Sequence, residues 1–234
     1  MLTSLTLRQH VSCVNMKGAM AKKRAYHHGD LRQALLKAAA AEIERSGYEN
    51  LSLRELAASL DVSRSAPYRH FADRGDLLAA LATQGFVELR HRYEERSGLP
   101  TPAMQLRACG HAYLQLAAER PQLFRLMFAS DLLSGSSPPD PALAEAATAC
   151  YVAFEALVAA TRPRADQKTI KAVTIAYSSA AYGFALLRTG NRLRPFMRAG
   201  LSDDELIDVL LSLDVTNARR RPAVTAVRAS RTVR

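Results

Sequence analysis

Residues 51–71, LSLRELAASLDVSRSAPYRHF, hold the pattern that decides the fold of this chain. Ser52 and Glu55 have the spacing of a capping box, in which the Ser hydroxyl accepts from the Glu55 amide and the Glu carboxylate accepts from the Ser52 amide. Apolar residues then recur at helical spacing for only about eight residues before Asp61 interrupts them. Ser63 is a candidate cap for a second short helix that runs to the end of the stretch. The pattern therefore predicts two short helices joined by a tight turn.

Two short helices joined by a tight turn are typical of a helix-turn-helix DNA reader. The two helices cross closely, so the positions between them must be small or apolar, and these positions are Leu53, Leu56, Ala57, Leu60, Val62, Pro67 and Phe71. The opposite face of the second helix carries short or polar side chains, which can approach base edges and phosphates in the major groove. With Ser63 at its start, this face consists of Arg64, Ser65, Ala66, Tyr68, Arg69 and His70.

The flanking sequence predicts further helices and almost no strand, because apolar residues recur at helical spacing throughout. One helix precedes the motif, at residues 30–46, and a long one follows it, from a cap at Asp73 to residue 96. Gly98–Pro102 has the composition of a linker. Beyond it we expect helices at residues 103–119, 121–129, 141–161, 166–189 and 203–214, the last one opened by a second capping box at Ser202. The expected fold is therefore all-α, with about nine helices.

The positive charge of the chain is concentrated at its two ends. Residues 1–25 hold five basic residues and residues 215–234 hold six arginines, with no acidic residue in either segment, so these segments account for the whole net charge of +10. We expect both to be flexible. Such basic tails attract phosphate backbones without reading sequence, or they are simply solvated.

Several classes of protein are disfavoured by what the sequence lacks. Three widely spaced cysteines match neither a disulfide framework nor a zinc site, so we expect a reducing cytoplasm. The sequence has no stretch of about 18 uncharged apolar residues, so we do not expect a membrane-spanning helix. No cofactor or metal is expected, because Glu88-x-x-His91 and His27-His28 lack the further ligands that a metal site needs. We find no nucleophile elbow, zinc-protease motif or phosphate-binding glycine loop, so an enzyme is not expected.

Residues 27–89 resemble the N-terminal domain of the TetR/AcrR family of transcriptional regulators. The resemblance is carried by Leu53-Arg54-Glu55-Leu56-Ala57, Val62-Ser63, Tyr68-Arg69-His70-Phe71 and Arg74-Gly75-Asp76-Leu77-Leu78. It implies that Tyr68 places its hydroxyl on a DNA phosphate, and that Ser52 and Arg54 also touch the DNA backbone. It further implies that Arg74, where the family usually has Lys, lies at a helix start that favours a phosphate.

Three positions depart from the family pattern. Asp61 stands where Gly is common, although Asp tolerates a left-handed backbone better than most residues. Pro67 replaces a usual Leu; in a helix capped by Ser63 it would lose only the earliest helical hydrogen bond. Ala66, where Thr is frequent, removes a hydroxyl and with it a phosphate contact.

The remainder of the chain resembles, more loosely, the ligand-binding and dimerising domains of this family. We therefore expect a DNA-binding domain at residues 26–72, a connecting helix at 73–97, and an effector-binding and dimerisation domain at 98–214. Aromatic and sulfur side chains of the last domain are either plain core or the lining of a pocket for a small hydrophobic effector: Met104, Tyr113, Phe124, Met127, Phe128, Tyr151 and Phe154. The apolar faces of the last two long helices are expected to form a homodimer through Ile170, Val173, Tyr177, Ala181, Phe184, Ile207, Leu210 and Leu211.

The function that follows is that of a ligand-responsive transcriptional regulator whose homodimer binds a palindrome in double-stranded operator DNA. Family resemblance favours repression. Two alternatives stay open: a DNA-binding or architectural protein that needs no ligand, and a helical enzyme.

Overall fold

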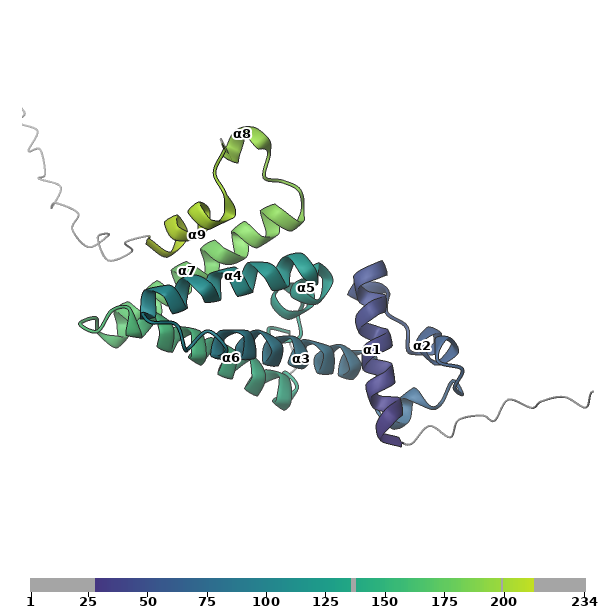
Figure 1. The fold of residues 1–234 in the computed structure, drawn as a ribbon. Helices are drawn as coiled ribbons and strands as arrows, with labels where there is room; N and C mark the ends of the chain where they lie inside the picture. Colours follow the sequence, from purple (N-terminus) through teal and green to yellow (C-terminus); the bar gives the residue numbers. More distant parts are fainter. Residues whose placement is uncertain (1–27, 136–137, 199, 213–234) are drawn as a thin grey trace, which may run out of the picture.

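The structure is a computed structural model that describes residues 28–135, 138–198 and 200–212. All regular elements in this part of the chain are helices, which confirms the predicted all-α fold (Figure 1). The two basic tails predicted at residues 1–25 and 215–234 lie outside the described residues.

One end of the molecule is formed by α1 (His28–Ser46), α2 (Leu53–Ser59) and two 3-10 helices, η1 (Tyr48–Asn50) and η2 (Pro67–Arg69) (Figure 1). α1 buries one apolar face, made of Leu31, Leu35, Leu36, Ala39 and Ile43. Gly47 follows α1 with a φ of 84°, a left-handed backbone conformation that residues other than glycine rarely adopt. A glycine at this position therefore lets the chain leave α1 and enter η1.

α3 (Arg74–Glu94) joins this end to the body of the molecule. It begins at Asp73, whose carboxylate accepts from the Asp76 amide at 2.9 Å, as the sequence predicts. α3 packs against α1 at one end and against α4 (Pro102–Glu119), α5 (Pro121–Ala129) and α6 (Pro141–Ala160) in the body (Figure 1). One hydrophobic core consequently runs without interruption from α1 to α6. Within the predicted linker Gly98–Pro102, residues 98–101 belong to the turn between α3 and α4 and Pro102 begins α4, and one core continues across it.

The remaining helices are α7 (Gln167–Thr189), α8 (Pro195–Arg198) and α9 (Asp203–Ser212). The capping box predicted at Ser202 is complete: its hydroxyl accepts from the Glu205 amide at 3.2 Å, and its amide donates to the Glu205 carboxylate at 2.8 Å. The sequence does not predict η1 or α8, because a single turn is too short to show an apolar period.

α6 and α7 are long and apolar enough to cross a membrane by length and composition alone. Core helices of soluble proteins meet the same criteria, so this observation is weak evidence for a span. Only 17% of the apolar window in α6 and 33% of that in α7 is buried within the chain. Both helices therefore leave apolar surface uncovered.

Candidate functional site

The turn after α2 closes as the sequence predicts. The Ser52 hydroxyl accepts from the Glu55 amide at 3.4 Å, which starts α2. Asp61 then adopts a φ of 51°, the left-handed conformation that Asp tolerates better than most residues. This reversal lets the Val62 amide donate to the Ala57 carbonyl at 3.0 Å. Ala57 is fully buried, so only a small side chain fits where the turn folds back.

The predicted second helix of the motif, from Ser63 to Phe71, is not an α-helix. The Ala66 amide donates to the Ser63 carbonyl at 2.9 Å, a three-residue spacing. Between Ser63 and Phe71, the one regular element is the 3-10 helix η2. Pro67 explains the difference, because it has no N–H to make the four-residue bond to Ser63. The Ser63 hydroxyl lies 3.3 Å from the Ser65 hydroxyl and does not cap a helix.

The side chains around η2 divide into an outer and an inner set. Arg54, Arg64, Ser65, Tyr68 and Arg69 are exposed, and we call these five residues the reading surface. Ala66 is half-buried against the core, and His70 is half-buried with its Nε2 atom enclosed and without a hydrogen-bond partner in the described part of the chain. The exposed face of this segment therefore lacks two of the residues that the sequence places on it, Ala66 and His70.

The apolar positions of the motif point into the core. Leu53, Leu56, Ala57, Pro67 and Phe71 are buried, while Leu60 and Val62 are half-buried against the same core. The Arg32 guanidinium of α1 lies 5.2 Å from the centre of the Phe71 ring. α1 thus packs against the inner side of η2, and the reading surface lies on the opposite side of η2 from this core.

The Arg74 side chain is exposed, and it also forms hydrogen bonds within the chain. Its guanidinium donates to the Tyr48 and Glu49 carbonyls at 2.7 and 3.0 Å, and so ties η1 to the start of α3. A phosphate at this helix start would meet the positive dipole end of α3, where the Asp76 amide is already bonded to the Asp73 carboxylate. The structure therefore gives Arg74 a bracing role beside the phosphate contact that the family resemblance implies.

A cavity of about 390 Å³ lies in the body of the molecule, between α3, α4, α5, α6, α7 and α9; we call it the central cavity. Of the expected pocket residues, four line it: Tyr113, Phe128, Tyr151 and Phe154. Phe124 and Met127 are buried between helices, and Met104 is exposed near the start of α4, so these three do not line it. Lining residues that the sequence does not predict include Phe86, Leu89, Tyr93, Cys109, Cys150 and Tyr182.

The described lining of the central cavity is aromatic, aliphatic and uncharged. Five tyrosines contribute to it, and no Asp, Glu, Lys, Arg or His is among these lining residues. Burial raises the pKa of Tyr93 and Tyr113 well above the ordinary range, and it raises the pKa of Cys109 and Cys150 to about 12. The cavity therefore offers neutral hydroxyl and thiol groups around an apolar space.

The faces predicted to form a dimer point into the molecule instead. Ile170, Val173, Tyr177, Phe184 and Ile207 are buried within the single chain. Tyr177, Ala181, Ile207, Leu210 and Leu211 line the central cavity. These side chains therefore face the interior of the single chain, and a homodimer formed through the last two long helices stays a prediction. The exposed faces of α6 and α7 carry other apolar residues, of which Val152 and Ile175 are 56% and 58% exposed.

One pair of hydrogen bonds and one close helix approach tie α5 to its neighbours. The Glu44 carboxylate of α1 accepts from the Gln122 and Leu123 amides at 3.1 and 2.9 Å, at the start of α5. Behind α5, a Cβ on Gly85 of α3 would lie 2.5 Å from the Met127 sulfur, so the two helices approach closely there. Because α5 also carries Phe128 of the central cavity, it lies between that cavity and the DNA-binding end.

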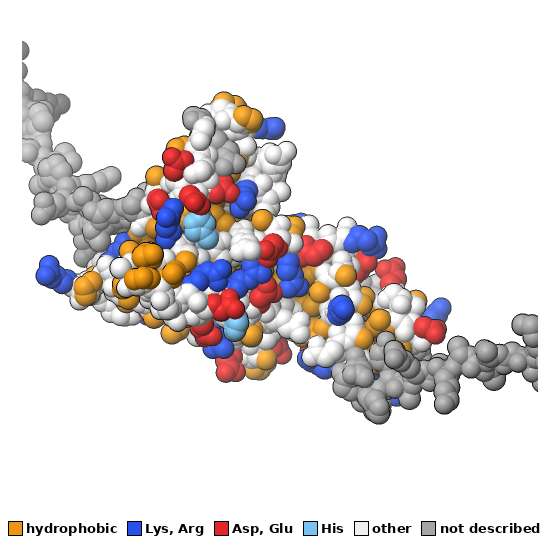
Figure 2. Space-filling view, viewed as in Figure 1, with side chains coloured by type: hydrophobic (Ala, Val, Ile, Leu, Met, Phe, Trp, Pro, Cys, Tyr) orange, Lys and Arg blue, Asp and Glu red, His pale blue; other side chains and the backbone are white. Residues whose placement is uncertain are grey.

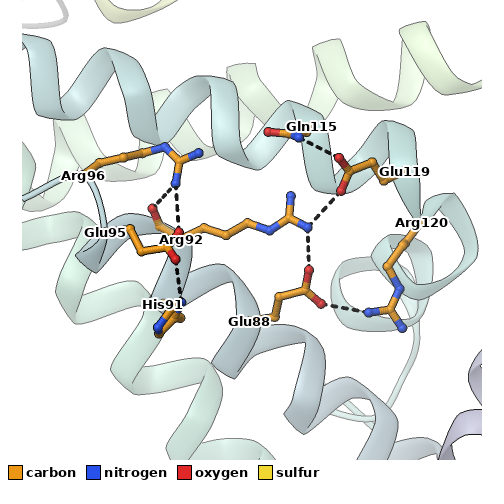
Figure 3. A network of polar contacts seen from close by, with 8 residues as sticks. All are labelled: Glu88, His91, Arg92, Glu95, Arg96, Gln115, Glu119 and Arg120. Atoms are coloured by element: carbon orange, nitrogen blue, oxygen red, sulfur yellow. Dashed lines mark hydrogen bonds and ion pairs between the residues drawn. The ribbon is translucent and has the colours of Figure 1, made fainter.

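A charged network on the surface joins α3 to the junction of α4 and α5 (Figure 3). Glu88 accepts from Arg92 and from Arg120, the latter at 2.8 Å, and Arg92 also donates to Glu119 at 2.9 Å. The hydrogen bond from Arg92, followed by one from Gln115, holds the pKa of Glu119 below its usual range. Figure 2 shows basic and acidic side chains side by side across the middle of the molecule.

Both members of the Glu88-x-x-His91 pair contact other charged side chains. Glu88 is held by two arginines, as described above, and His91 lies 3.4 Å from a Glu95 oxygen. Among the described residues, no group of three or more His, Cys, Asp or Glu side chains could hold a metal ion.

Two families match the chain, one at each end. Residues 35–81 match the family described as bacterial regulatory proteins, tetR family, and residues 106–213 match the tetracyclin repressor-like C-terminal domain. No curated protein sequence matches the chain.

Three solved structures illustrate the fold. A protein of unknown function from Rhodococcus sp. RHA1 is 29% identical, with a TM-score of 0.66 over 80% of this chain and 94% of that one. A TetR-family transcriptional regulator from Bordetella parapertussis is 18% identical, with a TM-score of 0.55 over 79% and 93% of the two chains. AibR, in complex with isovaleryl coenzyme A and operator DNA, is 19% identical, with a TM-score of 0.52 over 77% and 95%.

Proposed function

Because the chain belongs to the TetR family of bacterial regulatory proteins, we propose that it is a repressor whose homodimer binds a palindromic operator and releases it when a small hydrophobic effector binds. The observation that carries this proposal is an exposed reading surface at one end of a core that also encloses an uncharged cavity. In this proposal, residues 26–72 bind DNA, 73–97 connect, and 98–214 bind the effector and the second subunit.

The reading surface suits a division of labour on DNA. Arg64 and Ser65 precede η2 and would reach base edges, whereas the Tyr68 hydroxyl and Arg54 would contact phosphates. Ser52 is half-buried at the cap of α2, so its contact with the backbone would be through that helix start. A segment as short as η2 buries little groove surface, so one copy would bind weakly.

A second copy of the chain would supply the missing contact area. Two reading segments about 34–36 Å apart would enter successive major grooves of a palindrome. We propose that the uncovered faces of α6 and α7 form the dimer, because they carry Val152, Ile175 and Leu187, of which the last is 38% exposed. Tyr151 and Ile175 are exposed and also line the central cavity, so the partner would lie beside its mouth.

The effector would be a neutral, largely apolar molecule that fills the central cavity. An uncharged lining gives a carboxylate or phosphate no counter-charge, and desolvating such a group without a partner is costly. The tyrosine hydroxyls could still orient a ligand carbonyl or hydroxyl. Binding against Phe128 would displace α5, and α5 is held to α1 by Glu44. The displacement would thereby reach the reading surface.

The proposal is tested by operator binding with and without effectors. DNA upstream of the protein's own gene is titrated with the protein in the presence of neutral hydrophobic compounds, and fluorescence anisotropy reports binding. We expect tight binding that one class of compound weakens by about 150-fold, which corresponds to about 3 kcal/mol of coupling. Ala147→Phe, which fills the central cavity, should bind DNA but ignore the compound. Ala118→Phe, on the exposed side of α4, is the matched control and should still respond.

A protein that binds DNA identically with every compound would instead be a regulator without an effector. A protein that does not bind the upstream DNA, and selects no sequence from a random pool, would refute the proposed function.

A further inference from the structure

A second hollow, of about 480 Å³, lies beside the turn between α6 and α7, at the end of the molecule remote from α1 and α2 (Figure 1). We call it the tip pocket. Its apolar walls are Met104 and Leu106 of α4 and Leu211 of α9, and its charged residues are Arg107, Arg162 and Asp208. Leu211 also lines the central cavity, so the two spaces are neighbours.

The Arg162 guanidinium is fixed in the tip pocket by two hydroxyl groups. Its Nη1 donates to the Thr161 hydroxyl at 2.6 Å, and its Nη2 donates to the Tyr177 hydroxyl. Each hydroxyl donates its own proton to a carbonyl, Thr161 to Val158 at 2.7 Å and Tyr177 to Leu211. Both hydroxyls therefore serve Arg162 as acceptors. The guanidinium also lies 5.1 Å from the centre of the Tyr177 ring.

The charge of Arg162 has no carboxylate partner among the described residues. The nearby Asp208 is already occupied, because Arg107 Nε lies 2.7 Å from its Oδ1. A guanidinium has five N–H donors, and the two hydroxyls use only two of Arg162's. Its side chain is half-buried, and a cation withdrawn from water is stabilised by an anion that pairs with the remaining donors.

We propose that the tip pocket binds an organic acid, with its carboxylate on Arg162 and its hydrocarbon part against Met104, Leu106 and Leu211. A planar guanidinium suits a carboxylate because two parallel N–H donors can meet its two oxygens. The apolar walls favour an acid with a hydrocarbon chain over an inorganic anion. The tip pocket has charged lining residues, whereas the described lining of the central cavity has none. Because Arg162 bonds to Tyr177, which lines the central cavity, an acid here touches the wall of the effector site.

Calorimetry on the full chain without DNA tests the proposal, with octanoate as the probe. Octanamide has the same chain without the charge, and inorganic phosphate has charge without the chain. We expect octanoate to bind at least about tenfold more tightly than either, the effect of losing a charged hydrogen bond or the apolar contact. Equal binding of octanamide would mean that the hydrocarbon chain of the probe is enough for binding, in the central cavity, and would overturn the proposal. Equal binding of phosphate would overturn the assignment to an organic acid.

Two variants locate the site. Arg162→Gln should weaken octanoate binding by about tenfold or more, whereas the matched control Arg164→Gln, in the same turn and exposed, should leave it unchanged. Met104→Glu places a negative charge on the pocket wall without touching the bonds of Arg162, and it should also weaken binding. Circular dichroism establishes that each variant is folded. If Arg162→Gln does not fold, Met104→Glu decides. Octanoate binding that survives both changes would overturn the proposal.

Discussion

Replacing Glu44 by Gln tests how the DNA-binding end is joined to the body of the molecule. The Glu44 carboxylate accepts from the Gln122 and Leu123 amides at 3.1 and 2.9 Å. Both amides belong to the first turn of α5, where no acceptor within the helix is available. A Gln side chain offers one acceptor oxygen and no charge. The change therefore removes one charge-assisted hydrogen bond, about 1.5–3 kcal/mol, and the attraction between a carboxylate and a helix start, about 0.3–1 kcal/mol.

Because the contact is partly buried and the Gln retains one bond, we expect Glu44→Gln to lower the free energy of unfolding by about 2 kcal/mol, measured by urea denaturation. The matched control is Glu42→Gln, two residues earlier, since Glu42 bonds only to Arg45 and Ser46 of its own helix in the described structure. Ion pairs between residues three or four apart on one helix contribute about 0.5 kcal/mol or less, so Glu42→Gln should lower stability by no more than that. Equal losses in the two variants, or no loss in Glu44→Gln, would refute the reasoning.

Three further predictions concern the reading surface, the turn and the cavity. Tyr68→Phe should weaken binding to all DNA sequences alike, whereas Arg64→Ala should change which bases are preferred; competition binding with altered operators separates them, and uniform effects at both positions would count against these roles. Asp61→Gly relieves a φ of 51° and should raise the free energy of unfolding by about 1 kcal/mol in urea denaturation; a loss of stability would contradict this. Because burial raises the pKa of Cys109 and Cys150 to about 12, iodoacetamide near neutral pH should label them slowly until the protein unfolds, as mass spectrometry would detect; rapid labelling of the folded protein would contradict their neutral state.

Local chemistry explains which parts of the fold could be predicted from the sequence. The start of α2 follows from the side chain of Ser52 acting on a nearby amide, and the turn follows from a residue that accepts a left-handed backbone. Pro67 is equally local, yet its effect is larger than the loss of one bond, because three-residue bonds continue from Ser63 to His70 and only the Phe71 amide makes a four-residue bond, to the Pro67 carbonyl at 3.0 Å. The exposure of the reading surface depends on that tighter geometry. Sequence spacing based on an α-helix therefore places Ala66 and His70 too far outward.

The inward faces of α6 and α7 could not be predicted, because these helices are apolar on more than one side. Tyr177 is buried and Ile175, two residues away, is 58% exposed, although both are apolar and sit on the same helix. Apolar periodicity identifies the buried face only when the opposite face is polar. The same ambiguity affects α3, which the sequence presents as a connection. Its Phe86 and Tyr93 line the central cavity because α3 packs among the body helices as well as against α1.

Footprinting on the upstream DNA tests the central claim most directly, namely that two copies of residues 51–71 face one DNA duplex. We expect DNase protection over two half-sites whose centres lie about 10 base pairs, or a multiple of that, apart on one face of the duplex. Arg64→Ala should lose protection at the centre of each half-site. Protection that is continuous and independent of sequence, or that persists unchanged in Arg64→Ala, would contradict the account.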